Sequence, residues 1–287
     1  MTLAPTFLHI YIHKRTGESK WEHPTLPTTA PCAIMYHPET DTEKGERMYI
    51  FMKPLLWVPA FYVLAAVLPA AFLLYYVYRQ DRVEREPVGL LMSLLWKGVL
   101  AALCAIVLET LGQLLLDRLC TPGTFLHTVL LAFVVVAGAE EGMKLFFLKR
   151  RTWYDYQFNY RFDAIVYAVF VSLGFAAFEN IQYVFTYGLS VALPRALLSI
   201  PGHMAFAVYM GVFYGRAKLR ENRGNHAAAR SDLMMAYFSA VLLHGFYDAC
   251  AMVGTAKASV LFIAFVVVVY WRMIRLLKRE AAQDAPV

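Results

Sequence analysis

Long apolar segments are the feature that most constrains this chain. Seven of them occur, at residues 55–78, 89–116, 125–148, 163–187, 195–215, 233–253 and 256–276. A helix of about 20 apolar residues crosses a hydrocarbon core about 30 Å thick, and a helix satisfies its own backbone hydrogen bonds there. We therefore predict an all-α membrane protein, a polytopic bundle of about seven transmembrane helices.

The composition excludes several other classes of protein. Hydrophobic residues make up 59% of the chain and charged residues 17%, against about 45–50% and 25% in soluble domains. A soluble enzyme and a disordered protein are both excluded by this balance. The four cysteines are scattered, with no CxxC pair, so neither a disulfide framework nor a zinc knuckle is indicated.

The basic residues predict how the chain lies in the membrane. Four of the segments outside the spans, 79–88, 149–162, 216–232 and 272–279, hold 16 Lys and Arg, whereas the three intervening connections hold three. Short cytoplasmic segments carry this excess, so we expect a multi-pass protein of the cell (inner or plasma) membrane with a cytoplasmic C-terminus. The net charge of +6 then reflects orientation in the lipid bilayer, and no nucleic acid partner is expected.

The chain divides into a polar N-terminal stretch (1–54), a transmembrane domain (55–278) and a cytoplasmic tail (279–287). Residues 1–47 contain four of the eight His and five of the 13 Pro, and no apolar span. Two interpretations remain open: a disordered extracytoplasmic tail, or a translation start at Met48.

Ionisable side chains inside the spans are the candidate functional residues, because each costs at least about 2.5–3.5 kcal/mol in hydrocarbon. Two of them, Lys97 and Glu109, lie near span ends, where a structural role is the simpler interpretation. The other seven are Glu140, Glu141, Lys144, Glu179, His203, His244 and Asp248.

The third span contains the acidic pair Glu140 and Glu141. Lys144 lies three and four residues further on and can pair with either carboxylate. Adjacent helical positions diverge by about 100°, so we expect only one carboxylate to point fully at a given centre. A buried ion pair that merely locks the bundle is the structural alternative. A carboxylate left without a cation is instead suited to act as a general base.

Three later spans each add polar residues. Glu179 and Asn180 follow Gly174 in the fourth span, and Gly211 and Gly215 in the fifth form a small-xxx-small pattern; both patterns predict close helix packing. The fifth also has His203 after Pro201, and the sixth places His244 and Asp248 one turn apart, so that Asp248 can orient the imidazole.

Together these segments resemble the PrsW family of intramembrane proteases, relatives of the CAAX-prenyl-protease and bacteriocin-processing membrane enzymes. The matching motifs are EExxK, GFAxxEN, HxxF and a late His–Asp segment, at Glu140–Lys144, Gly174–Asn180, His203–Phe206 and His244–Asp248. The resemblance covers about residues 55–253. It implies an intramembrane endopeptidase with a membrane-spanning protein substrate, such as an anti-sigma factor that undergoes site-1-type cleavage.

The resemblance also marks Glu140, Glu141 and His244 as catalytic positions, with His203 and Glu179 close behind. Hydrolysis of a peptide bond needs an activated water, a proton donor and a stabiliser for the oxyanion. Either glutamate can serve as the base, with His244 as acid or oxyanion stabiliser. Lys144, Asn180 and Asp248 are the supporting residues.

Two chemistries remain open for this set of residues. His203 and His244 with Glu140 or Glu179 would suit zinc or another divalent metal that keeps an open water position. The spans contain no HExxH helix, which favours a metal-independent glutamate mechanism. A proton- or ion-coupled transporter uses similar buried residues, but no inverted repeat supports that alternative.

Overall fold

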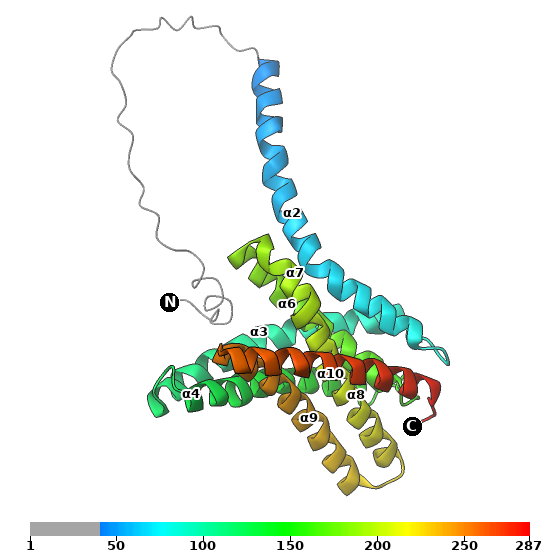
Figure 1. Ribbon diagram of the computed structural model, residues 1–287. Coiled ribbons are helices and arrows are strands. Elements are labelled where there is room, and N and C mark those ends of the chain that lie inside the picture. Colours follow the sequence, from blue (N-terminus) through cyan, green and yellow to red (C-terminus); the bar gives the residue numbers. More distant parts are fainter. Residues whose placement is uncertain (1–40) are drawn as a thin grey trace, which may run out of the picture. The chain divides into compact units, whose positions relative to one another are not determined.

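The computed structural model describes residues 41–287, with side chains from Trp57 onward (Figure 1). The predicted N-terminal tail therefore lies largely outside the described residues and stays a prediction. Within residues 41–54, the chain is already helical, because α2 begins at Asp41 and continues to Gln80. Residues 62–287 form one compact unit, and all packing described below lies within it.

Helices account for nearly all of the described chain, and their order follows the predicted spans. After α2 come α3 (Val88–Leu119), α4 (Phe125–Leu130), the π-helical η1 (Leu131–Val136), α5 (Ala137–Thr152), α6 (Asp163–Tyr187), the 3₁₀ turn η2 (Leu189–Val191), α7 (Ala192–Pro194), the π-helical η3 (Arg195–Ser199), α8 (Ile200–Asn222), α9 (His226–Val253) and α10 (Ala256–Ala282). The all-α polytopic fold is confirmed.

Six helical stretches are long and apolar enough to cross a membrane, among the residues that the structure describes. They match every predicted span except 125–148. That segment is helical too, but α4, η1 and α5 divide it. Its last part, α5, is polar overall because it contains the acidic motif and the basic residues at its end.

Helix α6 forms the centre of the unit, with α3 packed on one side and α8 on the other. Glycines allow these close approaches. A methyl group on Gly98 of α3 would lie 2.1 Å from the Val171 carbonyl oxygen, and one on Gly174 would lie 2.4 Å from that of Leu95. On α8, a methyl group on Gly211 would lie 2.6 Å from an α6 Cα atom. The close packing predicted at Gly174 and Gly211 is confirmed.

Helices α8 and α9 form a hairpin whose arms lie side by side (Figure 1). The Asn225 side chain accepts a hydrogen bond from the Ala228 amide and so starts α9, as N-cap residues do. Helix α10 packs across both arms. Its other face exposes large apolar side chains, among them Val260, Val267 and Trp271, which suits contact with lipid.

The segment after α10 returns to the loop that precedes α6. The Arg161 amide donates to the Ala285 carbonyl and the Val287 amide to the Asn159 carbonyl, each at 2.9 Å. The Asp284 carboxylate accepts from the Phe162 amide at 2.9 Å. The last described residues therefore cap the start of the central helix.

Candidate functional site

Four helices bring the predicted polar residues into one connected network. Helix α5 supplies Glu140, Glu141 and Lys144; α6 supplies Glu179 and Asn180; α8 supplies His203; and α9 supplies His244 and Asp248. Helix α5 follows the π-helical η1, and α8 follows the π-helical η3. Such local widening of a helix occurs frequently at functional sites.

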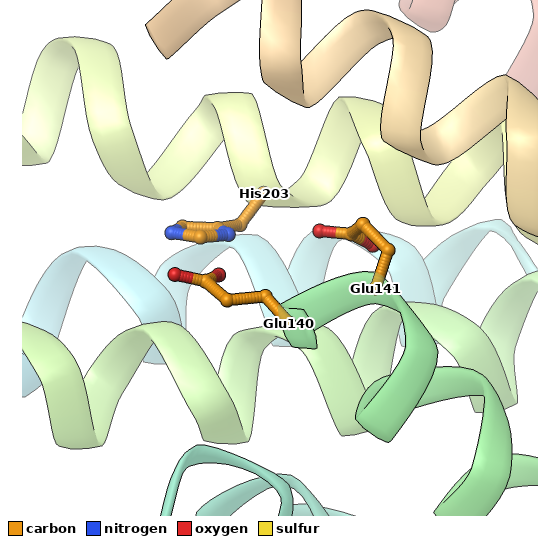
Figure 2. Close-up of side chains that lie close together, drawn as sticks. All are labelled: Glu140, Glu141 and His203. Carbon is orange, nitrogen blue, oxygen red and sulfur yellow. The ribbon is translucent and has the colours of Figure 1, made fainter. Parts of the chain in front are cut away.

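Lys144 lies at the centre of this network. Its Nζ atom donates to Glu140 Oε2 at 3.0 Å and to Glu141 Oε1 at 2.7 Å, and lies 3.1 Å from His203 Nδ1. Both glutamates therefore reach the same centre, and the expectation that only one would do so is wrong. The reason is the length of the glutamate side chain, whose rotatable bonds compensate for the divergence of adjacent positions. Figure 2 shows both carboxylates beside the His203 ring.

His203 bridges the Lys144 centre to Glu179. Its Nε2 atom lies 3.0 Å from Glu179 Oε2, while Nδ1 faces the Lys144 ammonium. An ammonium can only donate and a carboxylate can only accept. The contacts therefore select the neutral tautomer with hydrogen on Nε2, which leaves the Nδ1 lone pair directed at the α5 residues.

His244 has a different environment. Its Nδ1 atom lies 2.9 Å from Glu141 Oε1 and its Nε2 atom 3.3 Å from Asp248 Oδ2. Both ring nitrogens can donate to these carboxylates only in the imidazolium form. The ring also stacks on Phe206, with centroids 4.9 Å apart and planes inclined by 18°. His244 is thus oriented on three sides and positioned to hold a proton.

Part of the network is suited to a metal ion. Ligand atoms of Glu140, Glu141 and His203 lie within 4.8 Å of one another, and carboxylates with an imidazole are donors that zinc accepts. In addition, Glu141 Oε2 is buried without a hydrogen-bond partner. The other two metal candidates from the sequence lie just outside this group, Glu179 behind His203 and His244 against Glu141.

The charges in the network do not balance without further cations or protons. The network has four carboxylates and two permanent cations: Glu140, Glu141 and Glu179 pair with Lys144 or Arg195, and Asp248 joins through His244. With both imidazoles neutral, two negative charges are left over. A divalent cation or two added protons would supply the difference.

Sequence reasoning missed one member of this network, Arg195, and one carboxylate close to it, Glu109. Arg195, which we counted with a loop, begins η3 and pairs with Glu179 at 3.2 Å. Glu109 of α3, which we set aside as structural, is close enough for electrostatic repulsion of Glu140 and Glu179. A helical pattern extended back through Pro194 would have placed Arg195 two turns before His203, on the same side of the helix.

Comparisons with known proteins agree with the motifs. The model of a family described as PrsW family intramembrane metalloprotease matches residues 86–274. Proteins named Protease PrsW are similar over most of their length. The one from Halalkalibacterium halodurans is 31% identical over 214 residues, 75% of this chain and 94% of the relative.

Two further relatives with the same name give similar values. The protein from Clostridioides difficile is 31% identical over 72% of this chain and 86% of its own length. The protein from Bacillus subtilis is 29% identical over 75% of this chain and 93% of its own length. No solved structure matches the chain significantly. The family description favours the metal alternative over the metal-independent mechanism.

Proposed function

Because this chain belongs to the PrsW family of intramembrane metalloproteases, we propose that the network around Lys144 is its active site, where a peptide bond of a membrane-spanning protein is hydrolysed. The observation that carries this proposal is the convergence of Glu140, Glu141, His203 and His244 from three helices. All four residues are at most 6% exposed, so the reaction would proceed away from lipid and bulk water.

The two glutamates would have different roles. Glu141 is fully buried, and its Oε1 atom contacts both Lys144 and His244; it would hold these two side chains in place. Glu140 contacts Lys144 at 3.0 Å, lies 3.9 Å from His244 Nδ1 and is slightly exposed. It would therefore be the general base that accepts a proton from the attacking water.

His244 would complete the proton transfers. Held by Glu141 and Asp248, it would carry a proton and pass it to the leaving nitrogen as the peptide bond breaks. Asn180 donates to the Ala66 carbonyl at 2.7 Å and accepts from Arg195. We therefore assign it to support of the site.

The donor atoms fit a divalent metal, and zinc is the ion that we propose. Glu141 and His203 would hold it, with Glu140 beside it as the base and Glu179 behind the imidazole, as carboxylates commonly stand behind metal-bound histidines. When bound, the metal would act as a Lewis acid on the scissile carbonyl. Lys144 contacts one atom of each of Glu140, Glu141 and His203, so the ammonium would compete with the metal for these side chains.

The substrate that we propose is a single-span membrane protein, and an anti-sigma factor with site-1-type cleavage is the specific candidate. The apolar outer faces of α3 and α10 suit the lipid bilayer through which such a helix would approach. We also propose the cell membrane as the location, with the C-terminus in the cytoplasm, on the distribution of basic residues.

Co-expression with tagged single-span proteins tests this function. We expect wild type to cleave at least one candidate and Glu140→Gln and His244→Ala to abolish cleavage while the proteins still fold. Glu141→Gln should lose both cleavage and thermal stability, because Lys144 and His244 lose a shared partner. Glu280→Gln is the matched control, since that carboxylate pairs with Arg161 outside the site. Full cleavage by folded Glu140→Gln would refute the assignment.

A further inference from the structure

Arg195 is a largely buried arginine that neither the motifs nor the proposed reaction explains. It begins η3, and its side chain is 11% exposed. An arginine in a membrane-spanning segment is costly unless it is paired. The free-energy cost of placing Arg195 here must therefore be offset by the contacts that its side chain makes.

The contacts of Arg195 all lead to one turn of α6. Its Nη2 atom lies 3.2 Å from Glu179 Oε2, and its Nε atom donates to Asn180 Oδ1 at 2.7 Å. The guanidinium also lies over the Tyr183 ring, 3.8 Å from the centroid. A planar guanidinium can make these contacts at the same time, whereas an ammonium is a point charge without this geometry.

The Asn180 contact gives this clamp a fixed anchor. The amide nitrogen of Asn180 donates to the Ala66 carbonyl of α2 at 2.7 Å, while its oxygen accepts from Arg195. Asn180 is itself fully buried. Arg195 is thus held between α2, α6 and η3, and it has little freedom to leave Glu179.

Glu179 carries the influence of Arg195 to the α5 residues. The same oxygen, Oε2, contacts both Arg195 and His203 Nε2. A carboxylate fixed at Nε2 keeps the hydrogen on that nitrogen and directs the Nδ1 lone pair toward Lys144 and the glutamates. Without that fixed carboxylate, the contact between Nδ1 and Lys144 alone would have to hold the ring and its tautomer.

We propose that Arg195 is a positioning residue of the protease: it clamps Glu179 so that His203 presents Nδ1 to the group formed with Glu140 and Glu141. The inference rests on the proposed function of that group. It requires no contact between Arg195 and the substrate.

Purified wild type, Arg195→Gln and Arg195→Lys would be compared by zinc titration in detergent and by cleavage kinetics on a protein that wild type cleaves. Changes behind a metal-binding histidine cost about 10–100-fold in metal affinity or activity. We expect Arg195→Gln to weaken zinc binding and to lower kcat within that range, with KM changed less than about twofold. Arg195→Lys should recover part of both, because it restores the charge without the planar geometry.

Arg216→Gln is the matched control. Arg216 lies on the same continuous helical stretch, near the opposite end, and pairs with Asp232 at 3.3 Å. This variant should keep wild-type zinc affinity and kcat. Equal losses in Arg216→Gln and Arg195→Gln would mean that any lost ion pair on this helix has the same effect, and would overturn the proposal.

The Glu179→Gln background tests the route of the effect, and the double variant with Arg195→Gln contains neither charge of the pair. If Arg195 acts through Glu179, adding Arg195→Gln to Glu179→Gln has no further effect on zinc affinity or kcat. A further loss in the double variant would refute that route. If Glu140→Gln is inactive but Arg195→Gln keeps wild-type zinc affinity and kcat, this inference alone is overturned. If Glu140→Gln is fully active, the proposed function is overturned. If wild type binds no zinc, the kcat comparison decides.

Discussion

Asp81, in the connection between α2 and α3, makes a quantitative prediction about pH and stability. Its side chain is 1% exposed, and neither carboxylate oxygen has a hydrogen-bond partner of normal geometry. Burial, with a smaller contribution from the negative charge of Asp284, raises the pKa of Asp81 from 3.8 to about 6. The folded protein therefore binds a proton at this position more tightly than the unfolded chain does.

The sign and size of the effect follow from this difference. Stability from the raised pKa is fully present below about pH 4 and is lost as the pH rises through about 6. At about 1.4 kcal/mol for each tenfold change in proton affinity, the loss approaches about 3 kcal/mol. Asn has nearly the same shape and no charge to bury. Asp81→Asn should therefore be up to about 3 kcal/mol more stable than wild type at pH 8, with most of the gain absent at pH 4.

Thermal unfolding of the detergent-solubilised protein at pH 4 and pH 8 measures this difference. Glu84→Gln is the control, because Glu84 belongs to the same connection but is exposed, and it should show little change at either pH. An equal gain at both pH values, or a variant less stable than wild type at pH 8, would contradict the electrostatic reasoning.

Three further predictions concern packing and charge. Gly98→Val should lower the free energy of unfolding by about 3 kcal/mol, the upper end for overpacking, because a Cβ at this position would meet α6 backbone atoms. A Cβ at Gly89 on the same helix would meet nothing within 4 Å, so Gly89→Val should be tolerated. Lys144→Met should lose about 3–5 kcal/mol of unfolding free energy, as a broken buried ion pair does. Added zinc should raise the melting temperature of this variant more than that of wild type. An equal effect of zinc on both proteins would count against a metal site at these residues. Asn225→Ala should cost about 1 kcal/mol by loss of the α9 cap, measured by the same unfolding assay, and an unchanged stability would show that the cap is dispensable.

The arrangement of the site shows where sequence reasoning was sufficient. Apolar runs predicted every helix long enough to span, because hydrocarbon admits few other backbone structures. Buried ionisable residues stood out for the same reason, since each is costly in an apolar run. Glu140, His203 and His244 were recognisable as candidates without coordinates, and so were the glycines at the α3–α6 and α6–α8 contacts.

The contacts between those residues could be identified only from the tertiary structure. The sequence showed that Lys144 can reach either glutamate, but the structure showed that it reaches both and His203 as well. Arg195 looked like a loop residue, because Pro194 and the π-helical turn interrupt the pattern on which a helix is recognised. Its partner Glu179 is 16 residues away along the chain, and nothing in the local pattern links them.

The amino-acid order alone determined that this protein is a helical membrane bundle with acids and imidazoles in its interior. Hydropathy and helical periodicity are local properties, so a linear reading captures them. Only the tertiary structure decided which carboxylate faces which imidazole, which histidine tautomer results, and that an unrecognised arginine stands behind Glu179. Those features depend on distances of a few ångströms between helices, which are set by packing across the whole bundle.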